Sequence, residues 1–293
     1  MSYQPADFDQ AFADRFASFK LLGKGGEGAV LAVWDRVRKA DVAVKLARDA
    51  GEPGLFERFE REYQILAVTR SDRLVRVFDH GQALVRRPDG VIEPHFWYSM
   101  ERCDANVRKT SPHMAIAERL AVVLQMLDGL ALLHAKNIAH RDIKPDNLFL
   151  STSPKGARSV KIGDFGIATI ARVAPNAMSG TVYGSPVYLA PERWQAEADD
   201  DWRPADQYAA GITLFEVLSG GQLPLDFSGG HLRGHERSAV RPLPIPELRG
   251  RRVAAVDEVI RQMLAKRPQW RHADMASCKR ELEAALLGDG ITG

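Results

Sequence analysis

Short apolar runs separated by glycines and charged turns fill the first third of the chain. Runs of this length between turn residues are typical of antiparallel strands. They cover residues 19–22, 29–34, 41–45, 74–79 and 95–100. Residues 55–67 have helical period instead, and Phe8, Phe12 and Phe16 recur at every fourth position before the first strand. The pattern therefore predicts a small β-sheet with one main helix, preceded by a turn or two of amphipathic helix.

The rest of the chain is predicted to be helical. Apolar residues recur there at helical spacing in the segments 115–136, 206–219, 253–266 and 276–287. The segment 219–246 is rich in Gly, Pro, His and Arg, and we expect it to be a long surface loop. The change from strands to helices falls near residues 101–105, so we predict an α+β fold in two parts.

The composition narrows the class of protein without defining its chemistry. Hydrophobic residues make up 45% and charged residues 27%, as in soluble globular proteins. Forty Lys and Arg against 38 Asp and Glu give no charge field that would favour nucleic acid or a membrane surface. Two distant cysteines, Cys103 and Cys278, favour a reducing compartment. Neither a signal peptide nor a membrane segment is visible, so we expect a cytoplasmic protein.

Several candidate catalytic residues lie close together in residues 140–147, whose sequence is His-Arg-Asp-Ile-Lys-Pro-Asp-Asn. Asp142 can orient and deprotonate an acceptor hydroxyl, Lys144 can neutralise moving phosphoryl oxygens, and Asn147 can hold a magnesium ion. Phosphoryl transfer to a hydroxyl requires a carboxylate, an ammonium and a carboxamide of this kind. We therefore expect this segment to be a catalytic loop.

A glycine-rich segment lies between two strand-like runs. Gly23, Gly25 and Gly28 follow the spacing Gly-x-Gly-x-x-Gly, and glycines let backbone amides approach phosphates without an intervening Cβ. Dinucleotide-binding folds use a similar pattern but continue into a helix, whereas a strand-like run follows here. Taken alone, the segment fits a phosphate-binding loop or an ordinary hairpin turn.

Three charged residues elsewhere fit a nucleotide and metal site. Lys45 is the last residue of an apolar strand. Taken alone, it would be interpreted as a solvated residue at the end of the strand, but Glu62 on the following helix is its expected partner. Glu60 should face another side of that helix. Asp164 opens an Asp-Phe-Gly sequence 22 residues after Asp142, and is expected to bind magnesium together with the amide of the catalytic loop.

The order and spacing of these motifs resemble the catalytic domain of eukaryotic-type (Hanks-type) Ser/Thr protein kinases over about 250 residues, and the Ala- and Arg-rich texture suggests a bacterial source. The resemblance implies a bilobal fold, with a small antiparallel β-sheet N-lobe and a larger α-helical C-lobe. It also implies ATP and Mg²⁺ (or Mn²⁺) as cofactors, and protein substrates with Ser or Thr acceptors. The implied parts are an N-terminal extension, the N-lobe, the C-lobe and a tail, at 1–18, 19–102, 103–288 and 289–293.

The resemblance further implies an adenine pocket that draws residues from both lobes. Backbone groups of Glu101 and Cys103 would bond the base. The side chains implied to surround it form a roof, a back wall and a floor, and the whole set is Leu22, Val30, Ala43, Met100, Glu101, Cys103 and Phe149.

A substrate platform is implied after the metal site. Glu192, in an Ala-Pro-Glu sequence, is expected to pair with Arg271 as a buried ion pair. Ser185 is expected to supply the hydroxyl that bridges Asp142 and Lys144, where the family more often has Thr. Asp206 resembles the helix-start aspartate that bonds back to the catalytic-loop backbone.

Regulation is implied by Arg141, which directly precedes the catalytic aspartate. In this family such an arginine often receives a phosphate on the activation segment. Ser179 and Thr181 are the expected autophosphorylation sites, and the reaction in trans would need a transient dimer. A pseudokinase scaffold is one alternative, and a small-molecule kinase of the antibiotic-phosphotransferase type, which normally lacks the Ala-Pro-Glu platform, is another.

Overall fold

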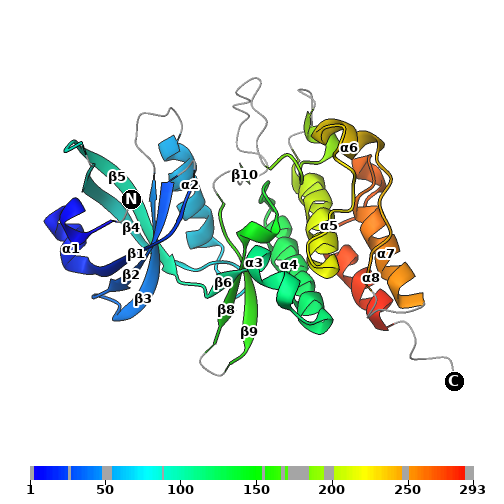
Figure 1. The fold of residues 1–293 in the computed structure, drawn as a ribbon, viewed down its shortest axis with the longest axis horizontal. Coiled ribbons are helices and arrows are strands. Elements are labelled where there is room, and N and C mark those ends of the chain that lie inside the picture. The colour runs from blue at the N-terminus through cyan, green and yellow to red at the C-terminus, as the bar shows by residue number, and fades with distance from the viewer. Residues whose placement is uncertain are drawn as a thin grey trace. The chain divides into compact units, whose positions relative to one another are not determined.

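The computed structural model describes residues 3–25, 28–47, 55–87, 89–153, 156–165, 169–170, 185–194, 201–245 and 251–287. The chain divides into two compact units. The first unit is Met1–Asp104 together with Asp164–Gly166, and the second is Ala105–Gly163 with Ile167–Gly293. The first is built on a β-sheet and the second mainly on helices, which confirms the predicted α+β fold (Figure 1).

A five-stranded antiparallel sheet forms the first unit, in the order β1-β2-β3-β5-β4. Its strands are β1 (Phe16–Lys24), β2 (Gly28–Asp35), β3 (Ala40–Ala47), β4 (Val77–Arg86) and β5 (Ile92–Glu101). The helix α2 (Leu55–Val68) follows β3. The strand expected at 74–79 begins later, because the Leu74 amide donates to the Ser71 carbonyl in a turn.

The central strand β3 is buried from Val42 to Ala47, and its alternation sorts the side chains onto two faces. Val42, Val44 and Leu46 join the cluster that contains Trp97. Ala47 joins a second cluster with Phe59 of α2. Since residues two apart share a face, Lys45 lies on the face that α2 covers.

The N-terminal residues complete the core of the first unit. They form a short 3₁₀ turn, η1 (Pro5–Asp7), and helix α1 (Gln10–Arg15). Asp9 caps α1 by accepting from the Phe12 amide, and its other oxygen accepts from the Leu84 amide of β4. Phe12 and Phe16 pack edge-on against Trp97, each worth about 0.5–1.5 kcal/mol beyond the area buried.

The second unit places its helices around α5 (Arg203–Ser219), in which residues 205–218 are all buried. The other helices are α3 (Val107–Thr110), α4 (Ile116–Ala135), α6 (His231–Arg237), α7 (Arg251–Met263) and α8 (Met275–Leu287). Short 3₁₀ turns are η2 (Ser111–His113), η3 (Pro145–Asn147), η4 (Pro191–Trp194) and η5 (Pro268–Trp270). No helix in the described part of the chain combines the length and apolar character that crossing a membrane would need.

Two small sheets hold the loops of the second unit. One is β6 (Ala105–Asn106), β8 (Leu148–Thr152) and β9 (Arg158–Ile162), in the order β6-β8-β9. The other pairs β7 (Ile138–Ala139) with β10 (Thr169–Ile170). Because η3 lies between β7 and β8, the loop of residues 140–147 is fixed at both ends.

The expectation that 219–246 is a surface loop is wrong in part. The segment contains α6, and Leu225, His235, Leu243 and Ile245 are buried. His235 is held on both ring nitrogens, 3.0 Å from the Tyr208 hydroxyl and 2.7 Å from the Pro186 carbonyl oxygen. These distant partners fold the segment back onto the unit.

Candidate active site

The backbone of the loop 140–147 is held by one carboxylate of α5. Asp206 accepts hydrogen bonds from the amides of His140 and Arg141, both at 2.7 Å. Arg141 has a φ of 71°, a conformation that non-glycine residues rarely adopt. Such strain persists where surrounding contacts impose it, and it is common at functional sites. The sequence therefore folds here into a rigid, strained loop.

Asp142 collects donors from its own loop and from a distant segment. Its Oδ2 accepts from Lys144 Nζ at 2.6 Å and from Asn147 Nδ2 at 3.0 Å. Its Oδ1 accepts from the amide and hydroxyl of Ser185, at 3.2 and 3.1 Å. Lys144 Nζ also donates to Ser185 Oγ at 2.7 Å. The structure thus brings together the four residues that the sequence predicted for this part of the site.

The amide of Asn147 is oriented by the same aspartate. Nδ2 donates to both the Asp142 carboxylate and the Asp142 carbonyl, at 3.0 and 2.8 Å. Because both donors are used in this way, the amide oxygen is the atom that Asn147 can offer to a cation.

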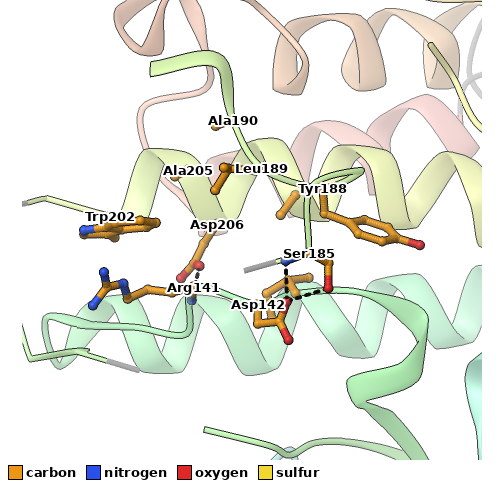
Figure 2. Close-up of a pocket in the computed structure, with 11 residues that line it drawn as sticks. Arg141, Asp142, Ser185, Tyr188, Leu189, Ala190, Trp202, Ala205 and Asp206 are labelled. Carbon is orange, nitrogen blue, oxygen red and sulfur yellow. Dashed lines mark hydrogen bonds between the residues drawn. The ribbon is translucent and has the colours of Figure 1, made fainter. Parts of the chain in front are cut away.

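Asp142, Lys144, Asn147 and Ser185 are together called the acceptor centre. A pocket lies beside it in the second unit (Figure 2). Asp142 and Ser185 lie on one side, and Arg141 and Trp202 lie on the other (Figure 2). The Arg141 guanidinium stacks on the Trp202 ring at 3.8 Å from its centroid, and Arg193 stacks on the same ring at 4.4 Å. Trp202 could not be predicted from the sequence, since no motif in its neighbourhood marks it as a partner of the loop.

The first unit holds the other charged residues of the predicted site. Lys45 Nζ donates to Glu62 Oε2 at 2.6 Å and to Asp164 Oδ1 at 3.0 Å. The second oxygen of Glu62 accepts from the Phe165 amide at 3.0 Å. Glu60 is exposed and accepts from Gln64, so Glu62 is the partner of the lysine. Asp164 has a φ of 62° and a half-exposed carboxylate, which leaves it accessible to a ligand.

The surroundings of this ion pair are buried. The Tyr98 ring is inaccessible, and burial, with the neighbouring Glu62 carboxylate, raises the pKa of Tyr98 well above its ordinary value. Glu62 itself is 1% exposed. A charge in such a place needs its partner, because little water is available to solvate it.

The three predicted loop glycines lie on the β1–β2 hairpin of the first unit. The Gly25 amide donates to the Gly28 carbonyl at 2.8 Å, and Gly28 has a φ of 149°. A Cβ at Gly23 or Gly25 would meet no atom within 4 Å, so open space lies beside the backbone at both positions. This is the accessibility that a phosphate would need.

The residues implied for an adenine pocket are divided between the units. Leu22, Val30, Ala43 and Met100 lie on β1, β2, β3 and β5 of the first unit, with Glu101 and Cys103 at its end, and Phe149 lies on β8 of the second. Ala43 pairs with Met100 across the sheet. The Glu101 amide donates to the Arg76 carbonyl, so only its carbonyl could bond a base.

The implied platform pair is present in the second unit. Arg271 Nη1 and Nη2 donate to the two carboxylate oxygens of Glu192 at 2.7 and 2.8 Å. Arg271 also donates to the carbonyls of Ala265 and Pro204. The predicted phosphorylation sites Ser179 and Thr181 lie outside the described residues.

The chain is similar to known proteins over most of its length. The family model for the protein kinase domain matches residues 16–281. The serine/threonine-protein kinase Pkn1 of Myxococcus xanthus is 34% identical over 281 residues, which cover 93% of this chain and 39% of that protein. PknB of Mycobacterium tuberculosis, also a serine/threonine-protein kinase, is 32% identical over 291 residues, with coverage of 94% and 44%. The chain therefore spans less than half the length of these relatives.

Proposed function

Because the chain belongs to the protein kinase family, we propose that it transfers the γ-phosphoryl group of ATP to serine or threonine hydroxyls of proteins. The observation that carries the proposal is the convergence of Lys144, Asn147 and Ser185 on the carboxylate of Asp142. This arrangement supplies a base and a cation beside one hydroxyl-binding position. The relatives that match most of the chain are themselves named serine/threonine kinases.

Asp142 and Lys144 divide the chemistry of the transfer. Asp142 orients the substrate hydroxyl and accepts its proton as the oxygen bonds to the γ-phosphorus and the bond from that phosphorus to the leaving ADP oxygen breaks. Lys144 Nζ lies 2.6 Å from that carboxylate. Its ammonium stabilises the negative charge that develops on the oxygens of the transferred phosphoryl group. Ser185 fixes both groups, because its hydroxyl bonds to each of them. Positioning of this kind is the main source of catalysis in phosphoryl transfer.

The nucleotide would be held by the first unit. Lys45, fixed by Glu62, would bind phosphate oxygens, and the open space beside Gly23 and Gly25 would let the phosphates approach the hairpin backbone. Asp164 and the amide oxygen of Asn147 are the ligands that the family resemblance implies for a divalent cation, and oxygen ligands of this type would suit Mg²⁺. That cation would neutralise charge on the phosphate oxygens.

A protein acceptor is favoured over a small molecule by the Glu192–Arg271 pair. This pair fixes the segment that follows Ser185, and small-molecule kinases of the antibiotic-phosphotransferase type normally lack such a platform. A pseudokinase scaffold is disfavoured, because Lys45, Glu62, Asp142, Asn147 and Asp164 are all present.

The direct test is incorporation of labelled phosphate from ATP into a degenerate Ser/Thr peptide library, set beside an aminoglycoside panel. Asp142→Asn serves as the negative control. Transfer to peptides by the wild type alone supports the proposal. Equal signals from both proteins would indicate a scaffold, and transfer to aminoglycosides alone would indicate a small-molecule kinase.

We further propose that autophosphorylation at Ser179 or Thr181 raises activity, with Arg141 as the residue that receives the phosphate. The pocket position of Arg141, next to Asp142, supports a link between that phosphate and the catalytic loop. Mass spectrometry of active protein that found both hydroxyls unmodified would contradict this. A reducing compartment that contains ATP is the proposed setting, since Cys103 and Cys278 are far apart in the sequence and form no disulfide with each other.

A further inference from the structure

His235, on α6, is a buried histidine that the proposed chemistry does not use, although both of its ring nitrogens are bonded. Its Nε2 lies 2.7 Å from the Pro186 carbonyl oxygen. Because that carbonyl can only accept, Nε2 carries the ring proton, and Nδ1 accepts from the Tyr208 hydroxyl at 3.0 Å. The side chains of His235 and Tyr208 are both inaccessible to solvent. The imidazole therefore joins α5 to the segment that begins at Ser185.

Pro186 directly follows the residue that bridges the two charged groups of the acceptor centre. Ser185 donates to Asp142 Oδ1 from its amide and its hydroxyl, and its Oγ accepts from Lys144. The proline ring fixes φ at residue 186, which leaves little freedom between the bonded carbonyl and Ser185. Pro186 itself is exposed, so the bond to His235, rather than packing, holds its carbonyl in place.

One helix holds both sides of the acceptor centre. Asp206 of α5 accepts from two backbone amides of the catalytic loop, and Tyr208, two residues further along α5, holds His235. Figure 2 shows the bond from Asp206 to the loop and the bond from Ser185 to Asp142. Because residues 205–218 of α5 are all buried, the close-packed interior leaves the helix little room to move. It therefore fixes the catalytic loop directly, and the Ser185 segment through the imidazole.

We propose that His235 is a positioning residue for phosphoryl transfer, which holds the Pro186 carbonyl and thereby keeps Ser185 within bonding distance of Asp142 and Lys144. This rests on the proposed transfer to protein hydroxyls. Without the imidazole donor, the exposed Pro186 carbonyl turns to water, and Ser185 no longer bridges the carboxylate and the ammonium. The chemical step then slows, because small displacements of reacting groups are costly. ATP binding is unaffected, since the first unit holds the nucleotide.

The test measures peptide phosphorylation by three variants. His235→Leu should lower kcat by about tenfold and leave KM for ATP unchanged. His235→Gln, which keeps a donor for the Pro186 carbonyl, should retain most of the activity. Tyr208→Phe, which removes one hydroxyl and keeps the buried ring, should lower kcat less, and it replaces His235→Leu if that variant folds poorly. The matched control is His272→Leu, at a second buried histidine of the same unit whose Nε2 lies 3.2 Å from the Val259 carbonyl. It should lower the melting temperature without lowering kcat.

A double-mutant cycle separates positioning from general stability. In a Ser185→Ala background, His235→Leu should cost much less rate than in the wild type, because the hydroxyl that it positions is already absent. A folded His235→Leu with the wild-type kcat would overturn the inference, as would losses that simply multiply with those of Ser185→Ala.

Hydrogen exchange of the Ser185 amide, followed by NMR, tests the placement without catalysis. This amide donates to Asp142, so its exchange should become faster in His235→Leu and not in His272→Leu. Unchanged exchange in His235→Leu would also overturn the inference. A wild type that transfers no phosphate would reject the proposed function, and the exchange rates would still decide whether His235 positions Ser185.

Discussion

The Lys45 ammonium lies 2.6 Å from the Glu62 carboxylate, and both side chains are almost inaccessible to solvent, at 9% and 1% exposure. Glu62 also accepts from the backbone amide of Phe165, so it ties the lysine of β3 to the segment that carries Asp164. A buried charge pair adds little net stability, but loss of one partner is costly because the other remains desolvated. The pair therefore positions Lys45 and Asp164 together.

Glu62→Gln is expected to lower kcat/KM for ATP by about tenfold to a hundredfold, because Lys45 loses the charge that orients it. The free energy of unfolding should fall by about 3 kcal/mol. Steady-state kinetics and urea denaturation measure the two effects. Glu60→Gln, on the exposed side of the same helix, is the control and should change neither quantity. Unaltered kinetics in Glu62→Gln would refute the positioning role.

Asp142→Asn is expected to reduce turnover by about 10² to 10⁴ fold while nucleotide affinity stays near that of the wild type. The amide can still accept hydrogen bonds, but it cannot take the hydroxyl proton. Phosphate transfer gives the rate, and fluorescence titration with a labelled nucleotide gives the affinity. Asp226→Asn, a fully exposed position, is the control. Equal rates for Asp142→Asn and the wild type would remove Asp142 as the base.

Arg271→Lys tests the forked pairing with Glu192. A lysine keeps the charge but cannot bond both carboxylate oxygens at once, and the Arg271 side chain is only 1% exposed. We expect a loss of about 3 kcal/mol in the free energy of unfolding, measured by urea denaturation. Arg261→Ala, which breaks an i,i+4 pair between the exposed Arg261 and the partly buried Asp257, should cost only about 0.5 kcal/mol. Similar small losses in both variants would mean that the buried pair is not a structural anchor.

The helices and most strands could be predicted from the sequence because their signals are local. The periodicity in 55–67 corresponds to α2 (Leu55–Val68), and that in 115–136 corresponds to α4 (Ile116–Ala135). The segment 219–246 has no such period. Its helix α6 has seven residues and no side-chain cap, and it is stabilised by Tyr208 and Pro186 from elsewhere in the chain.

The same distinction between local signals and contacts of distant residues applies to the candidate active site. Asp142, Lys144 and Asn147 lie within six consecutive residues, so one loop places them together and the sequence can group them. Arg108 of α3 donates hydrogen bonds to Asp146 and Glu216, which lie 38 and 108 residues further along the chain. Each of these residues alone would be taken as a solvated charge. Only the tertiary fold brings such groups together, since no local period or motif links them.

His235 is predicted to make stability depend on pH. Since the Pro186 carbonyl can only accept, Nε2 carries the proton and Nδ1 accepts from the Tyr208 hydroxyl. Burial, and to a smaller extent the nearby Lys266 and His231, lowers the pKa of His235 from 6.5 to about 4, against opposing effects of the Pro186 carbonyl and Glu192. Between these two pH values the unfolded chain binds the extra proton, so stability should fall as pH drops from 6.5 towards 4.

Thermal denaturation of the wild type and of His235→Gln, from about pH 7 to about pH 4, checks this prediction. The glutamine keeps a donor for the Pro186 carbonyl but has no proton to gain. The melting temperature of the wild type should therefore fall further than that of the variant as the pH drops. The difference between the two melting temperatures should change steadily through this pH range. His113→Gln, at an exposed histidine, serves as the control and should follow the wild type. Parallel pH profiles for the wild type and His235→Gln would show that the buried imidazole takes up no proton on unfolding.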